Sequence, residues 1–241
     1  MRVLLLGGTG EARSLAARLH PEVELISSLA GRVPDPALPV GQVRIGGFGG
    51  VRGLADWLRA NDITTVVDAT HPFAATITAN AARASALAGL SHLVLARPAW
   101  PDGEAIVVGS DTEAAEVVAG NGYRRVFLTT GRSGTAAFRG TDAWFLIRAV
   151  TAPADDRLPA HREVLLSRGP YRVDDELTLL REYGIDALVT KNSGGDMTRA
   201  KLAAATEIGV PVIMVSRPPL PAGVQVVRTV QAAVDWVAAQ A

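Results

Sequence analysis

The feature that most constrains this chain is a pattern that occurs twice, about 120 residues apart. An apolar run at residues 3–6 leads into Gly-Gly-Thr-Gly at 7–10, and a run at 126–129 leads into Gly-Arg-Ser-Gly at 131–134. A pattern repeated at such a spacing indicates two copies of one structural unit. We therefore expect a fold with two similar halves.

The repeat continues downstream of both glycine turns. In the first copy, residues 66–72 lead through an Ala-rich stretch to Arg-Pro at 97–98, and in the second, residues 188–195 lead through a similar stretch to Arg-Pro at 217–218. Each copy thus reads strand, polar turn, helix, strand and Arg-Pro. This order predicts two α/β halves that face one another across an interdomain cleft, the kind of place where ligands commonly bind.

The composition excludes several kinds of site and partner. The chain of 241 residues has no cysteine, so disulfides, thiolate nucleophiles and Cys-ligated metals are ruled out, and we assign no metal. Its formal net charge is zero, which gives no overall field to attract nucleic acid or a membrane surface. No apolar stretch approaches the roughly 20 residues of a membrane helix, and the first residues do not read as a signal peptide. We expect a cytoplasmic protein with a small-molecule ligand; the oligomeric state, a monomer included, stays open.

Strands and helices are expected to alternate through both halves. The predicted strands are short continuous apolar runs, which is typical of a parallel sheet covered by helices on both faces. Strands are expected at 2–6, 23–27, 65–69, 93–96, 126–129, 144–148, 163–167, 187–190 and 212–215, and helices at 11–19, 51–60, 74–88, 112–119, 133–138, 173–183 and 198–208. A further strand at 224–228 and a helix at 230–239 follow.

These elements predict an α/β fold with two Rossmann-like, doubly wound parallel-sheet domains. We place the first domain at residues 1–100 and the second at 101–241, on either side of the linker sequence Pro-Ala-Trp-Pro-Asp-Gly at 98–103. The sequence leaves open which of the two sheets takes the C-terminal strand.

The first glycine turn has the context of a dinucleotide-binding turn, because it follows the first strand and opens a helix. Glycines let the backbone approach a pyrophosphate, and the helix start offers N–H groups and a partial positive charge. We expect Gly8, Thr9 and Gly10, with Glu11 at the helix start, to bind the coenzyme. Arg13 stands where the usual fingerprint has a third glycine, so a tight turn without a ligand is the alternative.

The end of the second predicted strand indicates which coenzyme binds. NAD sites usually carry an acidic residue there for the ribose hydroxyls. Here Ser27 and Ser28 are followed by Gly31 and Arg32, and hydroxyls with a guanidinium suit a 2′-phosphate. NADPH is therefore predicted over NADH, with Ser28 and Arg32 at the phosphate. A solvated turn arginine is the alternative.

Two further turns follow predicted parallel strands, where α/β proteins place their sites. His71, in Asp-Ala-Thr-His-Pro-Phe-Ala at 68–74, can give a proton near neutral pH, although a structural role is the alternative. The turn Lys-Asn-Ser-Gly-Gly at 191–195, with Lys201 beyond it, offers N–H groups and charge to an anion. A simple helix cap is the alternative for this second turn.

Five cations are expected at one edge of the sheets, since they fall at or just after predicted strand ends: Arg97, Arg132, Arg168, Lys191 and Arg217. Guanidinium groups match carboxylates with two hydrogen bonds. In a chain of net charge zero, this clustering predicts a ligand with several negative groups.

Taken together, these motifs resemble the precorrin-6A reductase family of cobalamin biosynthesis. The resemblance covers nearly the whole chain and is carried by Leu-Gly-Gly-Thr-Gly-Glu-Ala-Arg (6–13), Ser-Leu-Ala-Gly-Arg (28–32), Gly-Gly-Phe-Gly-Gly (46–50), Asp-Ala-Thr-His-Pro-Phe-Ala (68–74), Arg-Pro-Ala-Trp (97–100), Thr-Gly-Arg (130–132), Arg-Gly-Pro-Tyr (168–171), Lys-Asn-Ser-Gly-Gly (191–195) and Arg-Pro (217–218). Tyr171 is the one departure, since many relatives have Phe there.

The resemblance implies an NADPH-dependent oxidoreductase that reduces one double bond of the metal-free macrocycle precorrin-6A and gives precorrin-6B. It also implies site roles. Thr70 and His71 would border the nicotinamide, and the proton would come from His71, Lys191 or water. The many carboxylates of the macrocycle would be held by Arg97, Arg132, Arg168, Lys191, Ser193, Gly194, Gly195, Lys201 and Arg217.

Three other functions are alternatives. The same reduction of the cobalt-containing intermediate is open, because the macrocycle would carry its own metal. A module that senses NADPH without catalysis is a second alternative. A short-chain dehydrogenase is disfavoured, because Tyr123, Tyr171 and Tyr183 all lack a lysine four residues later.

Overall fold

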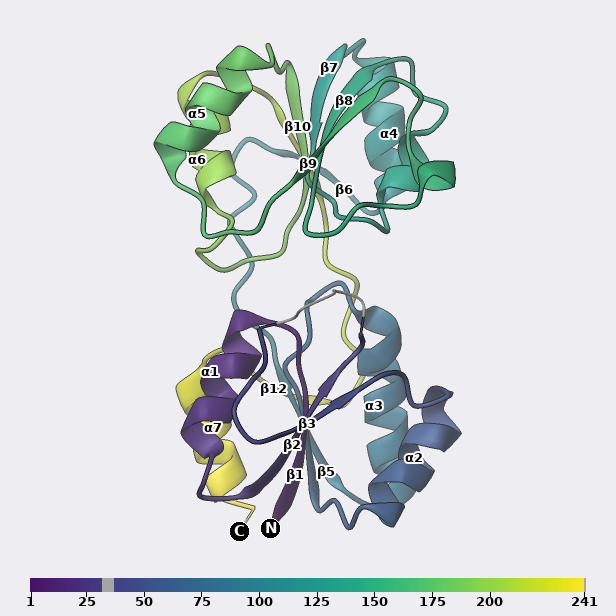
Figure 1. Ribbon diagram of the computed structural model, residues 1–241, viewed down its shortest axis with the longest axis vertical. Helices are drawn as coiled ribbons and strands as arrows, with labels where there is room; N and C mark the ends of the chain where they lie inside the picture. The colour runs from purple at the N-terminus through teal and green to yellow at the C-terminus, as the bar shows by residue number, and fades with distance from the viewer. Residues whose placement is uncertain (32–36, 241) are drawn as a thin grey trace. The chain divides into compact units, whose positions relative to one another are not determined.

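The computed structural model describes residues 1–31 and 37–240, which form two compact units (Figure 1). The first unit comprises Met1–Pro98 and Pro218–Ala241, and the second comprises Ala99–Arg217. Each is an α/β unit built on a six-stranded parallel sheet, so the predicted fold class of two Rossmann-like domains is confirmed.

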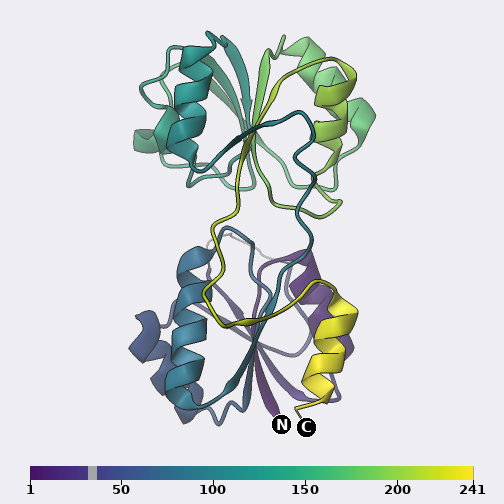
Figure 2. The same ribbon diagram turned by 180° about the vertical axis from the view of Figure 1, so that it is seen from behind.

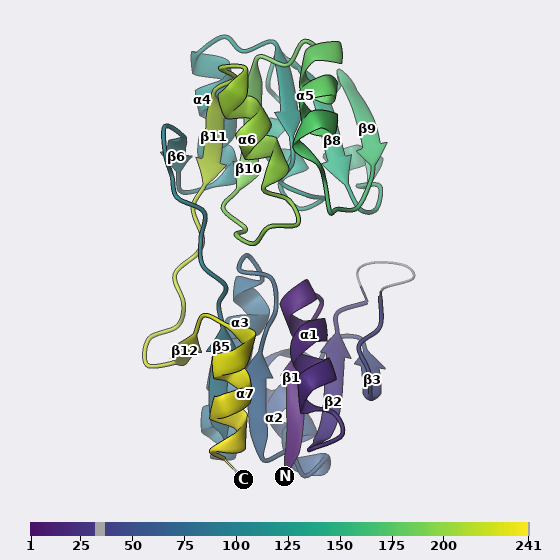
Figure 3. The same ribbon diagram turned by 90° about the vertical axis from the view of Figure 1, so that its left-hand side faces the viewer.

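The first sheet has the strand order β3-β2-β1-β4-β5-β12, the order of a Rossmann sheet. Its strands are β1 (Arg2–Leu6), β2 (Glu24–Leu29), β3 (Gln42–Ile45), β4 (Thr65–Asp68), β5 (Ser91–Leu95) and β12 (Gln225–Val227). Helices α1 (Gly10–Leu19) and α7 (Val230–Ala238) cover one face, and α2 (Gly50–Ala60) and α3 (Ala75–Ala88) cover the other (Figures 1 and 3). The strand order reverses between β1 and β4, and ligands bind at such a reversal.

The apolar run of β1 explains why this strand is central. Successive side chains of a strand point to opposite faces. Val3 and Leu5 therefore pack with α1 and α7, whereas Leu4 and Leu6 pack with α2 and α3. All four are buried, so the strand needs apolar residues at every position rather than at alternate ones.

The second sheet repeats this order as β9-β8-β7-β10-β11-β6. Its strands are β6 (Ile106–Val108), β7 (Arg125–Leu128), β8 (Trp144–Ala149), β9 (Arg162–Leu166), β10 (Ala187–Lys191) and β11 (Val212–Val215). Helices α5 (Val173–Glu182) and α6 (Ala200–Glu207) cover one face, and α4 (Asp111–Gly120) covers the other (Figure 1). Two short 3-10 segments, η1 (Thr135–Phe138) and η2 (Asp155–Arg157), complete this unit.

The chain crosses between the two units twice, and after each crossing it first forms an edge strand and a helix of the unit it enters. After β5 the chain forms β6 beside β11 of the second sheet, and after β11 it returns to form β12 beside β5 of the first sheet; Figure 2 shows both connections. The expected division into residues 1–100 and 101–241 therefore needs correction, because residues 218–241 belong to the first unit. Helical and strand periodicity do not say which sheet edge an end strand joins.

The remaining differences from expectation are local. The strands β3 and β6 were not expected, and the helix expected at 133–138 is the short η1. No helix in the described part of the chain is long and apolar enough to cross a membrane.

Candidate functional site

The glycine turn between β1 and α1 is shaped for an approaching ligand. Gly8 has a φ of 109°, which side-chain-bearing residues rarely adopt, and a Cβ built there would meet no atom within 4 Å. Thr9 caps α1, since its Oγ1 accepts from the Ala12 N–H at 3.1 Å and donates to the Ala69 carbonyl at 2.8 Å. The Thr9 hydroxyl thus joins the turn to the end of β4. The N–H groups of Gly7, Ala12 and Arg13 are already bonded within the protein, to the Ser28 carbonyl, Thr9 Oγ1 and the Thr9 carbonyl.

A salt bridge stands beside this turn. Arg97, which follows β5, donates from Nη1 to Glu11 Oε2 at 2.7 Å. Arg97 therefore belongs to the first unit, whereas the other four predicted cations belong to the second unit. The negative charge of Glu11, close to the expected position of a pyrophosphate, is balanced by this pair.

Arg44, on β3, contacts the end of β2 and was not singled out from the sequence. Ser28 is buried, and its Oγ accepts from Arg44 Nη1 at 2.9 Å. Arg44 is the parallel-strand partner of Ser28 on β3. Arg32, the other predicted phosphate ligand, lies outside the described residues. The signal for Arg44 was an arginine in a short strand just before a glycine-rich loop, and it was missed because β3 was not expected.

The turn after β4 orients Thr70 and His71. Asp68 Oδ1 accepts from the Thr70 N–H at 2.9 Å and from Thr70 Oγ1 at 2.6 Å. His71 is exposed, and its Nδ1 accepts from the Phe73 N–H at 3.3 Å. With Nδ1 as acceptor, the neutral imidazole carries its proton on Nε2.

In the second unit, three elements meet around Lys191. Lys191, at the end of β10, donates from Nζ to the Thr130 carbonyl at 3.1 Å and pairs with Asp111 Oδ2 at 3.0 Å. Asp111 is the first residue of α4, so the exchanged helix supplies this carboxylate. A Cβ at Gly134 would collide with Thr130 Oγ1 and lie 2.7 Å from Asp111 Oδ1. The second glycine turn, which also carries Arg132, therefore closes tightly over this ion pair.

The turn that follows Lys191 is held by two groups. Arg217 donates from Nε to the Asn192 carbonyl at 2.8 Å and from Nη2 to the Ser193 carbonyl at 3.0 Å. The Asn192 side chain accepts from the Trp100 N–H at 2.8 Å and donates to the Trp100 carbonyl at 3.0 Å. Trp100 Nε1 donates to the Gly195 carbonyl at 2.8 Å. Trp100 and Asn192 were not predicted; the sequence indicated a linker around Trp100, but this side chain is buried.

Lys201 differs most from expectation. It is 4% exposed, its Nζ donates to the Thr198 carbonyl at 2.6 Å, and it lies 4.8 Å from the Trp100 ring centroid. Burial lowers the pKa of Lys201 to about 7, while the charge of Glu176 acts in the opposite direction. Helix α6 begins at Ala200, so the turn at 193–195 does not open it directly. Lys201 therefore lies on the buried side of α6, and Lys191 is buried to a similar degree, at 9% exposed.

Apart from Lys201 and the undescribed Arg32, the predicted residues gather after the carboxyl ends of strands. In the first unit these are Gly8, Thr9, Gly10, Glu11, Ser28, Thr70, His71 and Arg97; in the second they are Arg132, Arg168, Lys191, Ser193, Gly194, Gly195 and Arg217. Arg168 is exposed and follows the edge strand β9. Parallel strands bring these ends to one edge of each sheet.

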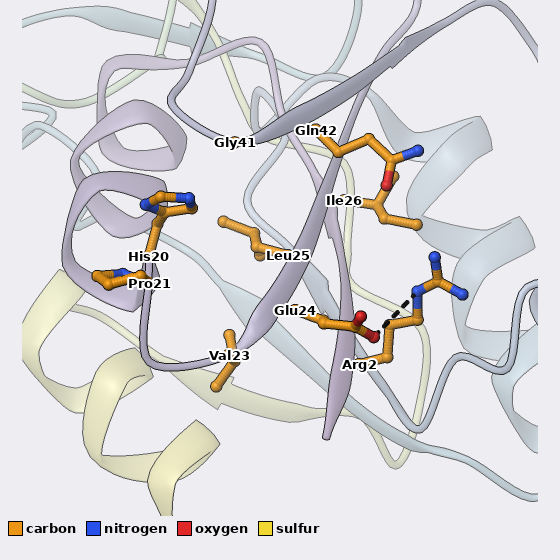
Figure 4. A pocket seen from close by; sticks show the side chains of 9 residues that line it. All are labelled: Arg2, His20, Pro21, Val23, Glu24, Leu25, Ile26, Gly41 and Gln42. Carbon is orange, nitrogen blue, oxygen red and sulfur yellow. Dashed lines mark ion pairs between the residues drawn. The ribbon is translucent and has the colours of Figure 1, made fainter.

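A cavity of about 260 Å³ in the first unit lies at the opposite end of the strands (Figure 4). Its lining includes Arg2 and Glu24, which begin β1 and β2 and lie 3.5 Å apart, and His20 after α1. It is therefore separate from the glycine turn. Within residues 1–31 and 37–240, no cluster of three or more His, Asp or Glu suits a metal ion.

Comparisons with known proteins agree along the whole chain. The family model described as precorrin-6x reductase CbiJ/CobK matches residues 2–238. The precorrin-6A reductase of Mycobacterium tuberculosis (strain ATCC 25618 / H37Rv) is 65% identical over 237 residues, which cover 98% of this chain and 97% of the relative. The precorrin-6A reductase of Rhodococcus erythropolis is 54% identical over 242 residues, covering 98% and 97%. The solved structure of CobK precorrin-6A reductase is 36% identical with a TM-score of 0.90, covering 100% of this chain and 97% of that one.

Proposed function

The chain belongs to the precorrin-6x reductase CbiJ/CobK family, a family of oxidoreductases, and from this premise we propose that it reduces precorrin-6A to precorrin-6B with NADPH. The proposal rests on two observations. In the first unit, the first turn of a Rossmann sheet leaves space around Gly8 at the start of a helix, where an anion can bind. In the second unit, several cations lie at or after the carboxyl ends of the strands. The relatives reported above are named for the metal-free substrate, which favours it over the cobalt-containing one.

The residues of the first unit fit a nicotinamide coenzyme. When bound, the coenzyme supplies the hydride, and the protein supplies position and electrostatics. Gly8, Gly10 and the start of α1 would hold the pyrophosphate, with Thr9 and the Glu11–Arg97 pair fixing the turn. Ser28 and Arg32 would receive the 2′-phosphate, and Thr70 and His71 would border the nicotinamide.

The second unit would hold the acidic macrocycle. Its carboxylates would be bound by Arg132, Arg168, Lys191 and the turn at 193–195, whose backbone Arg217 fixes. His71, Lys191 and water are the candidates for the proton donor. We place the reaction in the cytoplasm, without a nucleic-acid or membrane partner.

An assay of the purified protein tests this proposal. Precorrin-6A is supplied with NADPH or NADH, and the oxidation of the coenzyme is followed together with formation of precorrin-6B. We expect turnover with NADPH and with the metal-free substrate. Faster turnover of the cobalt-containing macrocycle would reassign the substrate, and NADPH binding without oxidation would favour a sensing module.

Substitution of Lys191 by alanine is expected to weaken substrate binding more than coenzyme binding. Losing a hydrogen bond to a charged group costs about 1.5–3 kcal/mol, which corresponds to a rise of roughly 10- to 100-fold in the KM for precorrin-6A. The KM for NADPH should change little, because Lys191 lies in the second unit. Steady-state kinetics with each substrate varied in turn measures both. The opposite ranking would move Lys191 to the coenzyme side.

A further inference from the structure

Arg44 is fixed at the end of the second and third strands of the first unit. It pairs in register with Ser28, and its Nη1 donates to Ser28 Oγ and to the Gly46 carbonyl, both at 2.9 Å. Its Nη2 donates to the Gly47 carbonyl at 3.0 Å, and its guanidinium lies 3.8 Å from the Phe48 ring centroid. The group is therefore held rigidly, with one face against an aromatic ring.

The charge of Arg44 is not balanced by any described carboxylate. The ion pairs of the described residues do not include it, and its hydrogen-bond acceptors are a hydroxyl and two carbonyls. Burial lowers the pKa of this half-buried guanidinium. The guanidinium is partly exposed, so an anion from solvent can approach it. Such an anion would supply the opposite charge that no described carboxylate supplies.

The location indicates which anion fits. Leu6, the last residue of β1 before the glycine turn, pairs in register with Ser28, and Ser28 pairs with Arg44. Arg44 thus lies two strands away from the pyrophosphate turn, on the side where a Rossmann sheet receives the adenosine ribose. An NADP-type coenzyme carries its extra phosphate on that ribose.

We infer that Arg44 and Ser28 form the 2′-phosphate subsite, with Arg44 as the residue that sets the preference for NADPH over NADH. This inference rests on the proposed function, because it assigns a further residue to the same coenzyme site. A guanidinium that also donates to the Ser28 hydroxyl can present both groups to one phosphate. Phe48 keeps the guanidinium plane in place.

The test compares ligands that differ by this one phosphate. Binding of NADPH, NADH, 2′,5′-ADP and 5′-AMP is measured calorimetrically for the wild type and for Arg44→Gln, which keeps polar atoms but removes the charge. We expect Arg44→Gln to weaken the binding of NADPH and 2′,5′-ADP by roughly 10- to 100-fold. The affinities for NADH and 5′-AMP should change less than about twofold. Arg44→Lys, which keeps the charge, should lose less affinity for NADPH and 2′,5′-ADP than Arg44→Gln.

The controls separate this inference from the proposed function. Arg52→Gln removes an equal charge from an exposed position on α2 and should leave all four affinities unchanged. If the wild type prefers NADPH and Arg44→Gln keeps that preference, or weakens NADPH and NADH equally, the inference is overturned and the coenzyme assignment stands. If the wild type itself binds 2′,5′-ADP no better than 5′-AMP, both are overturned. Retained NADH binding by the variants shows that they fold.

Discussion

Substitution of Glu176 by glutamine is expected to lower the free energy of unfolding of the second unit by about 3–5 kcal/mol, the usual cost of breaking a buried ion pair. Glu176 is 1% exposed, on α5, and pairs with Arg148 of β8 at 2.8 Å and 2.9 Å. Glutamine keeps the shape but leaves the Arg148 guanidinium without its anion, against the rings of Phe127 and Tyr171. Urea denaturation followed by circular dichroism measures the change.

A second cation makes this substitution costly. The charge of Glu176 raises the pKa of Lys201 against the effect of burial, and that of Arg148 lowers it. Glu176 thus compensates two buried cations at once. Asp175→Asn, in the same helical turn but exposed, is the matched control, and it should cost no more than the roughly 0.3–1 kcal/mol of a charge at a helix start.

The double variant decides whether the unpaired charge is the cause. Arg148→Met in the Glu176→Gln background removes the uncompensated guanidinium, so most of the lost stability should return. A double variant as unstable as the single one would show that the lost stability comes from the packing of α5 and not from the unpaired charge.

The internal repeat was enough to predict most of the fold. The strands β1 and β11 are mostly apolar, and β4 and β10 are buried along their whole length, because helices cover both of their faces. The strands β3 and β6 were missed because edge strands pair on one side only and tolerate exposure; Ile45 is 57% exposed and Val107 is 47% exposed. A strand of three or four residues with such exposure carries no clear period.

The exchange of end strands could not be predicted for a different reason. The segments that form β6 with α4 and β12 with α7 are alike, each with Val-Val followed by a hydroxyl residue that caps the helix, Ser110 or Thr229. Either segment suits either sheet edge, because the pairing uses backbone groups. The periodicity of the sequence therefore does not show which sheet each segment joins.

The site residues were predicted from strand ends, and the burial of Lys201 could have been predicted from the helical period. The predicted cations end or follow parallel strands, which share a carboxyl edge within each sheet, and their role in binding a substrate stays a prediction. Lys201 was predicted to bind an anion together with the turn at 191–195. Yet Lys201, Ala204 and Ala205 stand at positions i, i+3 and i+4 of α6, and all three are buried. This spacing marks the buried face of a helix.

Substitution of Lys201 by methionine is expected to stabilise the protein at neutral pH and to remove a pH dependence. The folded-state pKa of Lys201 is about 7, against about 10.4 for an unperturbed lysine. Below pH 7 both states hold the proton, so the full cost of burying the ammonium is present. Between about pH 7 and 10 only the unfolded chain holds it, so wild-type stability should rise by up to about 1.4 kcal/mol per pH unit.

Methionine keeps a long side chain on Trp100 and has no charge to bury, so the stability gained over the wild type should be largest below pH 7 and shrink toward pH 10. Denaturation curves of both proteins across this range measure the difference. The pKa itself is also accessible, because Lys191 and Lys201 are the only lysines of the chain. Lysine labelled with 13C should therefore give two side-chain signals, which the Lys201→Met variant assigns. A Lys201 midpoint near 10, or a stability difference that does not change with pH, would mean that water or Glu176 solvates the ammonium well enough to keep it charged in the folded protein.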